Sequence, residues 1–140
     1  MSFLLDTNAI SELSRPAADR DYLRWFDTAA EDDIFISVIT IGELKRGVSL
    51  LPEGDRKLQV GRVVTNIVLR FNDRILPFDQ KVADTWGELS ARLRRAGVVI
   101  GAPDEMIAAT SLAFGLTLVT RNTRHFASTG CALLSPWRAP

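Results

Sequence analysis

The sequence has almost none of the residues on which thiol or histidine chemistry depends, since its 140 residues include one cysteine and one histidine. The lone Cys131 excludes an intrachain disulfide and a thiolate metal cluster, and it is typical of a protein from a reducing compartment. With His125 as the only imidazole, the chain offers no strong Ser–His or Cys–His pair for nucleophilic catalysis. We interpret His125 as an exposed loop residue rather than a general base.

Long hydrophobic runs and an excess of charge of one sign are also missing. No apolar stretch approaches the roughly 20 residues that span a bilayer, and the N-terminus lacks the basic segment and cleavage site of a signal peptide. We therefore expect a cytoplasmic protein with no membrane contact. Lys and Arg number 17 and Asp and Glu number 17, so no overall basic field indicates nucleic acid, although arginines could still cluster on one face.

Hydrophobic residues, at 46% of the chain, are plentiful enough to bury a core, and the length fits a single domain over residues 1–140. Short apolar runs alternate with segments of helical periodicity, which predicts an α/β fold with a mainly parallel sheet flanked by helices. We expect strands at 3–5, 34–38, 75–76, 116–120 and 131–134. We expect helices at 9–14, 21–30, 55–71 and 104–114, one carrying Glu43 and one carrying Trp86 and ending before Gly97.

Three helix starts have a recognisable capping pattern. Thr40 followed three residues later by Glu43 has the spacing of a capping box, which predicts that Thr40 caps the helix and that Glu43 lies in its first turn. Thr7 or Asn8 is expected to cap the first helix, and Asp79 the helix of Trp86.

Acids and one amide stand where parallel strands end or helices begin. Asp6 and Asn122 follow apolar runs, while Glu43 and Asp104 lie near helix starts. Such positions can converge at one edge of a parallel sheet, where carboxylate oxygens bind a hard cation such as Mg²⁺ or Mn²⁺. Without a cation the clustered carboxylates would repel one another, and a bound cation would also activate water at a phosphodiester.

Four segments in this order resemble the four motifs of the PIN-domain nucleases, and more closely those of the VapC toxins with their FitB-like subgroup. The resemblance covers nearly the whole chain. It implies a PIN-like, three-layer α/β/α fold and a Mg²⁺-dependent endoribonuclease, with Mn²⁺ as a substitute. The matching segments are Leu4-Leu5-Asp6-Thr7-Asn8 with Ile10-Ser11-Glu12, Ser37-Val38 to Glu43-Leu44 with Gly47, Asp104 with Ile107-Ala108-Ala109-Thr110, and Val119-Thr120-Arg121-Asn122 with Phe126.

Position by position, the resemblance implies that Asp6, Glu43 and Asp104 are the metal-binding catalytic acids. Asn122 falls where many relatives carry a fourth acid. An amide oxygen at this position can still orient water, but the change favours one firmly held cation over two. The resemblance further implies that three residues support the site by hydrogen bonds to the acids or to water: Thr7, Asn8 and Thr120.

Residues near these motifs have plainer interpretations beside the functional ones. Arg121 and Arg124 flank the expected site and are candidate contacts to RNA phosphates, although each also fits a solvated loop. Glu12 belongs to the first motif but is expected at the surface or in support of the site. The tryptophans are expected in the core or an interface rather than stacked on bases: Trp25, Trp86 and Trp137.

The resemblance implies the toxin of a type II toxin–antitoxin pair, which cleaves RNA with metal-activated water to leave 5′-phosphate and 3′-hydroxyl ends. Its expected partners are RNA, a small VapB-like antitoxin, and a second copy in a homodimer or higher assembly. One alternative is a PIN fold that binds RNA or antitoxin with little or no catalysis, which Asn122 favours. Another is a phosphatase with Asp6 as covalent nucleophile, but such enzymes usually carry an Asp where this chain has Asn8.

Overall fold

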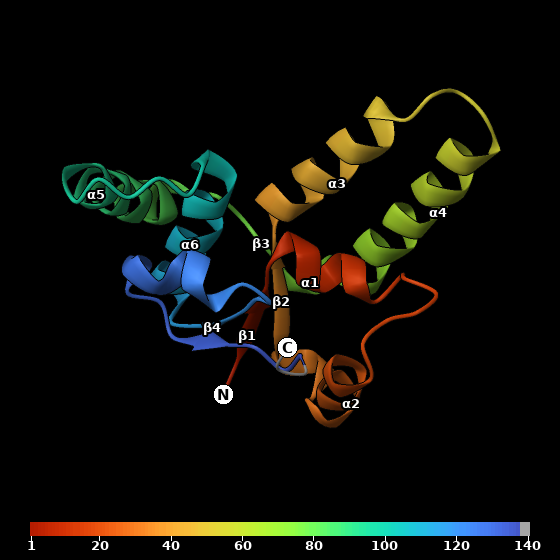
Figure 1. The fold of residues 1–140 in the computed structure, drawn as a ribbon, viewed down its shortest axis with the longest axis horizontal. Helices are drawn as coiled ribbons and strands as arrows, with labels where there is room; N and C mark the ends of the chain where they lie inside the picture. Colours follow the sequence, from red (N-terminus) through yellow and green to blue (C-terminus); the bar gives the residue numbers. More distant parts are fainter. Residues whose placement is uncertain (138–140) are drawn as a thin grey trace.

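The computed structural model describes residues 1–137, which are built around a five-stranded sheet in the order β3-β2-β1-β4-β5 (Figure 1). All of its strand pairings are parallel, which confirms the α/β architecture expected from alternating strands and helices. The strands are β1 (Phe3–Leu5), β2 (Ile34–Ser37), β3 (Ile75–Leu76), β4 (Thr117–Val119) and β5 (Leu133–Leu134).

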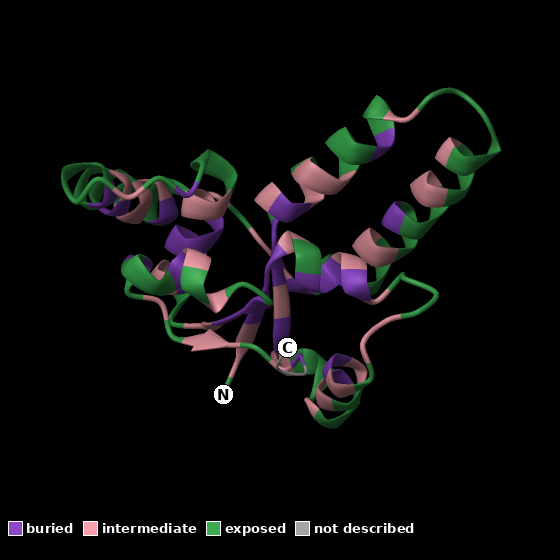
Figure 2. Cartoon of the chain, viewed as in Figure 1, coloured by how far each residue is buried: buried purple, intermediate pink, exposed green. Residues whose placement is uncertain are grey.

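Helices cover both faces of the sheet, because successive strand residues point to opposite sides. The helices are α1 (Thr7–Glu12), α2 (Arg20–Thr28), α3 (Val38–Leu50), α4 (Asp55–Arg70), α5 (Gln80–Arg95) and α6 (Ala102–Phe114). Leu4 and Leu118 pack in one core with α5 and α6, whereas Leu5 and Val119 pack in a second core with α1 and α2. The result is the three-layer α/β/α arrangement, with buried residues in the central strands and on the helix faces packed against them (Figure 2).

The start of α3 differs from the sequence prediction. Ser37, the last residue of β2, caps the helix by accepting a 3.0 Å hydrogen bond from the backbone N–H of Ile39. The prediction that Thr40 caps this helix is therefore wrong, because the chain turns into the helix directly at the strand end. Thr40 is instead buried inside the first turn, and Glu43 lies in the second turn.

The first helix is also capped by a different residue than expected. Asp6 caps α1 by accepting a 2.8 Å hydrogen bond from the N–H of Ala9, so the assignment of this cap to Thr7 or Asn8 is wrong. The prediction for α5 is confirmed, since Asp79 accepts from the N–H of Val82.

The helices α3 and α4 form an arm that projects from the sheet (Figure 1). Its far end is largely exposed, and the side chains of Leu50 and Leu58 are 67% and 60% accessible. Leu58 is exposed because that end of α4 lies beyond the sheet, whereas Val64 and Phe71, nearer the sheet, are buried.

The site described below lies where the strand order changes direction. From central β1 the chain adds β2 and β3 on one side of the sheet and later β4 and β5 on the other. Crevices at the carboxyl ends of such diverging strands are the usual ligand sites of open parallel sheets. Asp6 follows β1 and Thr120 follows the neighbouring β4 at this edge. Within residues 1–137, no helix is long and apolar enough to cross a membrane.

Candidate active site

Asp6 is the most buried acid of the site, with 5% of its surface accessible. Burial raises the pKa of its carboxyl group, and the negative charges of Asp104 and Glu43 raise it further. Hydrogen bonds from the Thr120 side chain and the Ala9 backbone act in the opposite direction. A carboxylate that is desolvated and faces two other acids is stabilised by a cation more strongly than a surface carboxylate.

Glu43 is oriented by a short chain of hydroxyl groups. The Thr7 hydroxyl donates to Glu43 Oε1, and the hydroxyls of Thr7 and Thr40 are 3.1 Å apart. Because Thr7 gives its only hydroxyl proton to Glu43, the proton between the two threonines must come from Thr40. Thr40 is fully buried, so this relay from α3 through α1 fixes the carboxylate of Glu43 from the protein interior.

Asp104 lies in the first turn of α6, where the helix dipole favours a carboxylate. The turn into the helix passes through Gly101, whose φ of 90° is costly for any residue with a Cβ atom. His125 Nε2 lies 2.9 Å from Asp104 Oδ2. The interpretation of His125 as an exposed loop residue is wrong, since its side chain is 31% accessible and lies against a predicted metal ligand.

Asn122 uses its side chain to organise the backbone that follows β4. Its Oδ1 accepts from the N–H of His125 at 3.2 Å and thereby caps the 3-10 helix η3 (Thr123–Thr129), an element that the sequence did not predict. The Asn122 N–H in turn bonds the Thr120 hydroxyl at 3.2 Å. These contacts stabilise the loop that follows β4, and the residue also borders the cavity of the site.

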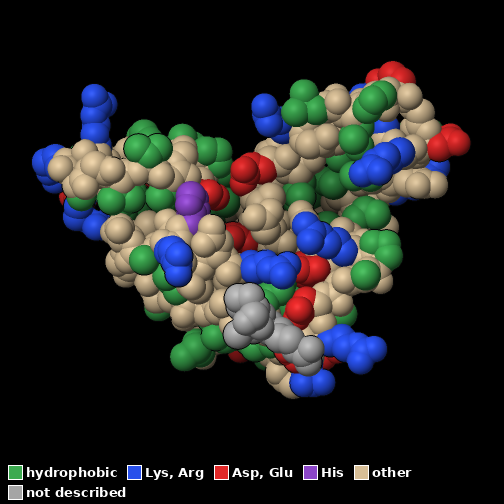
Figure 3. Space-filling view, viewed as in Figure 1, with side chains coloured by type: hydrophobic (Ala, Val, Ile, Leu, Met, Phe, Trp, Pro, Cys, Tyr) green, Lys and Arg blue, Asp and Glu red, His purple; other side chains and the backbone are tan. Residues whose placement is uncertain are grey.

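The structure brings all seven predicted catalytic and supporting residues to the wall of one cavity of about 260 Å³. In Figure 3 acidic side chains gather where the surface is hollowed between α3 and α6. Two residues that the sequence analysis did not assign to the site complete the wall, namely His125 and Phe126. The complete set is Asp6, Thr7, Asn8, Glu43, Asp104, Thr120, Asn122, His125 and Phe126.

The donor set fits a hydrated Mg²⁺ better than a fully protein-coordinated ion. Among residues 1–137, no three Asp, Glu, His or Cys side chains already stand together as a set of direct metal ligands. Mg²⁺ nevertheless keeps several of its waters and is commonly held by one or two carboxylates. A cavity lined by Asp6, Glu43 and Asp104 and wide enough for several waters matches that requirement.

The two arginines that were candidate phosphate contacts lie outside the wall of this cavity. Arg124 is exposed, and the Arg121 side chain is 61% accessible with its Nη1 3.8 Å from Glu12 Oε1. Glu12 is 4% accessible and accepts a hydrogen bond from Trp137, so the expected surface position of Glu12 is wrong. The buried position of Trp137 agrees with its expected place in the core.

Known proteins resemble this chain in both sequence and fold. Residues 3–130 match the family described as PIN domain. The chain is 38% identical to toxin FitB of Neisseria gonorrhoeae over 96% of its length and 97% of that protein. It is 36% identical to a VapC ribonuclease of Sinorhizobium fredii, with 96% of both chains covered.

Solved structures agree with the sequence comparison. The FitAcB crystal structure from Neisseria gonorrhoeae superimposes with a TM-score of 0.88 at 38% identity, covering 98% of this chain and 99% of that one. The DNA-bound VapBC structure from Salmonella typhimurium gives a TM-score of 0.82 at 29% identity, with 97% and 98% covered. Both neighbours share the fold over nearly the whole chain. A structure named as a toxin–antitoxin complex from Klebsiella pneumoniae gives a TM-score of 0.69 at 27% identity, with 99% and 100% covered.

Proposed function

The chain belongs to the PIN-domain family, and on that premise we propose that it is a Mg²⁺-dependent endoribonuclease that acts as the toxin of a toxin–antitoxin pair. One observation carries the proposal: Asp6, Glu43 and Asp104 come from three separate helix starts or turns and face one cavity at the carboxyl edge of the sheet. The relatives named as ribonucleases support RNA as the substrate class.

Each acid has a distinct task in this proposal. Asp6, Glu43 and Asp104 hold the cation, which when bound supplies water activation and neutralises charge on the phosphoryl group. Asp6 is buried at the end of β1, so its negative charge lies in a poorly solvated place, where electrostatic stabilisation is strongest. The Thr7 hydroxyl keeps the Glu43 carboxylate from rotating away from the cavity. Mn²⁺ prefers the same oxygen ligands and is the expected substitute.

Asn122 contributes to the proposed site without a negative charge. The family resemblance places it where a fourth acid is common, and we assign it a role in orienting water or a neighbouring group at the cavity wall. With three acids rather than four, one firmly held cation is the expected occupancy. Arg121 and Arg124 follow β4 beside the cavity and are the proposed contacts to the phosphates of RNA.

A small antitoxin is the proposed regulator, because one relative is named as toxin FitB and a structural neighbour from Klebsiella pneumoniae is named as a toxin–antitoxin complex. A homodimer or a higher assembly with the antitoxin is the proposed functional unit. The RNA substrate and the single free cysteine favour the cytoplasm as the place of action.

One observation favours a second candidate, a PIN protein that binds RNA or antitoxin without cleaving. The amide oxygen of Asn122 is already engaged with the His125 backbone, so the position of the fourth acid carries a capping amide. Three carboxylates remain at the cavity, which is why the nuclease is the stronger proposal.

The deciding experiment is cleavage of a mixed RNA pool by antitoxin-free protein, with Mg²⁺ or Mn²⁺ against EDTA. Asp6→Asn removes the buried charge and keeps a residue that caps helices as well as aspartate does. Asp27→Asn, an exposed acid on α2, is the matched control. Cleavage that needs the cation, is lost in Asp6→Asn and survives in Asp27→Asn supports the nuclease. RNA binding without cleavage in the wild type, with the cation present, supports the binding protein instead.

A further inference from the structure

His125 makes two contacts through one ring nitrogen. Nε2 lies 2.9 Å from Asp104 Oδ2 and 3.1 Å from the carbonyl oxygen of Ile100. A carboxylate oxygen and a backbone carbonyl are both acceptors, so neither supplies the hydrogen. Nε2 must therefore carry the proton and share it between the two oxygens. The contact thus fixes the tautomer as well as the position of the ring.

The imidazole is held in this place from two further directions. The His125 backbone N–H donates to Asn122 Oδ1 at 3.2 Å and to the Asn122 carbonyl at 3.1 Å. The ring meets the buried Phe126 edge to face, with centroids 5.1 Å apart. A residue fixed at its backbone and at its ring loses little further freedom when it holds a neighbouring carboxylate.

We propose that His125 is a positioning residue that holds Asp104 for the cation, and that Asn122 acts on the site through His125. This inference rests on the proposed nuclease function. The N–H from Nε2 occupies part of the acceptor capacity of Oδ2 and fixes the rotation of the carboxyl group, which leaves the other oxygen free to bind. Carboxylates that bind metals generally need such outer hydrogen bonds, and loss of one typically weakens metal binding about 10–100-fold.

A purely structural role for His125 is the competing explanation. Its contact with Ile100 joins the loop after β4 to the segment before α6, and that link alone would stabilise the fold. The two roles differ in what a substitution changes. Loss of a structural tie lowers the unfolding temperature and leaves the cation affinity of the folded protein unaltered. Loss of a positioning contact changes the cation affinity even well below that temperature.

Two amide substitutions separate these roles, because the side chains of Gln and Asn place an N–H at different distances from the backbone. The amide of His125→Gln reaches about as far as Nε2, whereas that of His125→Asn reaches only as far as Nδ1. His125→Phe keeps a ring against Phe126 and removes both nitrogens. Ser128→Ala, at an exposed position of the same 3-10 helix, is the matched control.

The measurement is Mn²⁺ binding to metal-free, antitoxin-free protein, by calorimetry or by the paramagnetic resonance signal of free Mn²⁺, with thermal unfolding recorded for every variant. We expect His125→Asn and His125→Phe to bind Mn²⁺ roughly 10-fold or more weakly. His125→Gln is expected to lie within a few-fold of the wild type, and Ser128→Ala to match it. RNA cleavage by the same variants should follow the same order.

Two results would overturn the inference, and they differ in what else they overturn. If the wild type binds Mn²⁺ and cleaves RNA while His125→Phe and His125→Asn bind Mn²⁺ equally well, His125 does not position Asp104 and the nuclease assignment stands. If the wild type neither binds Mn²⁺ nor cleaves RNA, the proposed function fails and the inference fails with it.

Discussion

The indole nitrogen of Trp137 donates a 2.7 Å hydrogen bond to the carboxylate of Glu12, which joins positions 125 residues apart in the sequence. Glu12 is 4% accessible, and the Trp137 ring stacks on Tyr22 with centroids 4.4 Å apart and planes 7° apart. The Tyr22 hydroxyl donates to the carbonyl of Ala9 in α1. Trp137 therefore holds in place the helix α1, which is capped by Asp6, a proposed metal ligand.

Trp137→Phe is expected to destabilise the fold, because it leaves the buried Glu12 carboxylate without its indole donor. A ring that can stack on Tyr22 remains, so the loss reports mainly the hydrogen bond. A buried acceptor that loses its partner typically costs about 1–3 kcal/mol, and a charged one more. Urea unfolding at neutral pH measures the change. Trp25→Phe, at a half-buried indole on α2, is the control and should cost less; equal losses would contradict the role of the bond.

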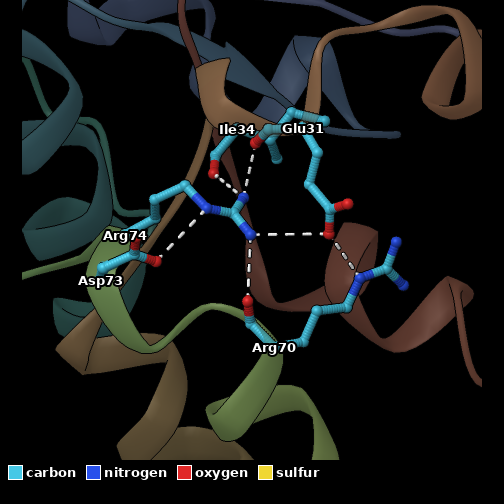
Figure 4. A network of polar contacts seen from close by, with 5 residues as sticks. All are labelled: Glu31, Ile34, Arg70, Asp73 and Arg74. Carbon is cyan, nitrogen blue, oxygen red and sulfur yellow. Dashed lines mark hydrogen bonds and ion pairs between the residues drawn. The ribbon is translucent and has the colours of Figure 1, made fainter.

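A second network fixes the base of the arm formed by α3 and α4, and Figure 4 shows its members. The Arg74 guanidinium is largely buried and donates to the carbonyl oxygens of Glu31, Ile34 and Arg70. The Arg70 Nε donates to the Glu31 carboxylate at 2.7 Å. The hydrogen bond from Arg70 lowers the pKa of Glu31, and the charges of Arg70 and Arg74 lower it further.

The Glu31→Gln variant is therefore expected to lose less stability than wild type as the pH falls into the acid range. A carboxyl group whose pKa is lower in the folded state takes up more protons when unfolded, so its contribution is present above its ordinary pKa of 4.5 and is lost as the pH falls through the lowered value. The variant should lose stability relative to wild type at neutral pH, and the difference should shrink below pH 4.5.

The comparison uses unfolding midpoints measured from neutral pH down through this range. Low salt is needed because the side chains of Glu31 and Arg70 are both about half exposed. Glu53→Gln removes the partner of Lys57, an exposed acid four residues before it in the chain, and serves as control. A constant difference between Glu31→Gln and wild type across the whole range would contradict the prediction.

Local sequence patterns predicted most of the elements, because each depends on near neighbours. The run Phe3–Leu5 is too short for a helix and forms β1, and Asp79 caps α5 through a contact three residues away. The same locality explains the error at α3. Thr40 and Glu43 have the spacing of a capping box, but Ser37 at the strand end already supplies the cap, and Thr40 is needed in the hydroxyl relay to Glu43.

The site acids could be predicted because parallel strands bring their carboxyl ends to one edge, which is a rule of topology. The neighbouring residues that contact those acids could not be predicted in this way. His125 meets Asp104 only because η3 forms after β4, and Glu12 is buried only because Trp137 returns to α1. Both contacts join segments whose relative position depends on the whole fold. The one local signal for His125 was Asn122 three residues earlier, which is a capping spacing.

Asp6→Asn should separate the effect of charge at the site from the effect of the helix cap. Burial and the charges of Asp104 and Glu43 raise the pKa of Asp6, so its ionised form is disfavoured when no cation is present. Asparagine caps helices about as well as aspartate. The variant is therefore expected to be at least as stable as wild type in EDTA at neutral pH.

Added Mg²⁺ should reverse that order. A ligand present at about 100 times its dissociation constant stabilises the folded state by about 2.7 kcal/mol, and wild type should gain stability in this way while Asp6→Asn gains little. Thermal unfolding with and without Mg²⁺ measures both effects, with Asp27→Asn expected to follow wild type. An equal Mg²⁺ response in Asp6→Asn would remove Asp6 from the cation site.

Asn122→Asp tests whether the missing fourth acid limits the site to one firmly held cation. Aspartate accepts from the His125 N–H as asparagine does, so η3 should keep its cap and the imidazole its position. The added charge faces a cavity that already contains three carboxylates, and their repulsion is relieved only by a cation. We therefore expect the variant to be less stable than wild type in EDTA and to bind Mn²⁺ more tightly or in a second equivalent. Calorimetric titration gives the stoichiometry, with Asn66→Asp on the exposed arm as control. If Asn122→Asp binds Mn²⁺ as wild type does, the fourth position does not govern how many cations the site holds.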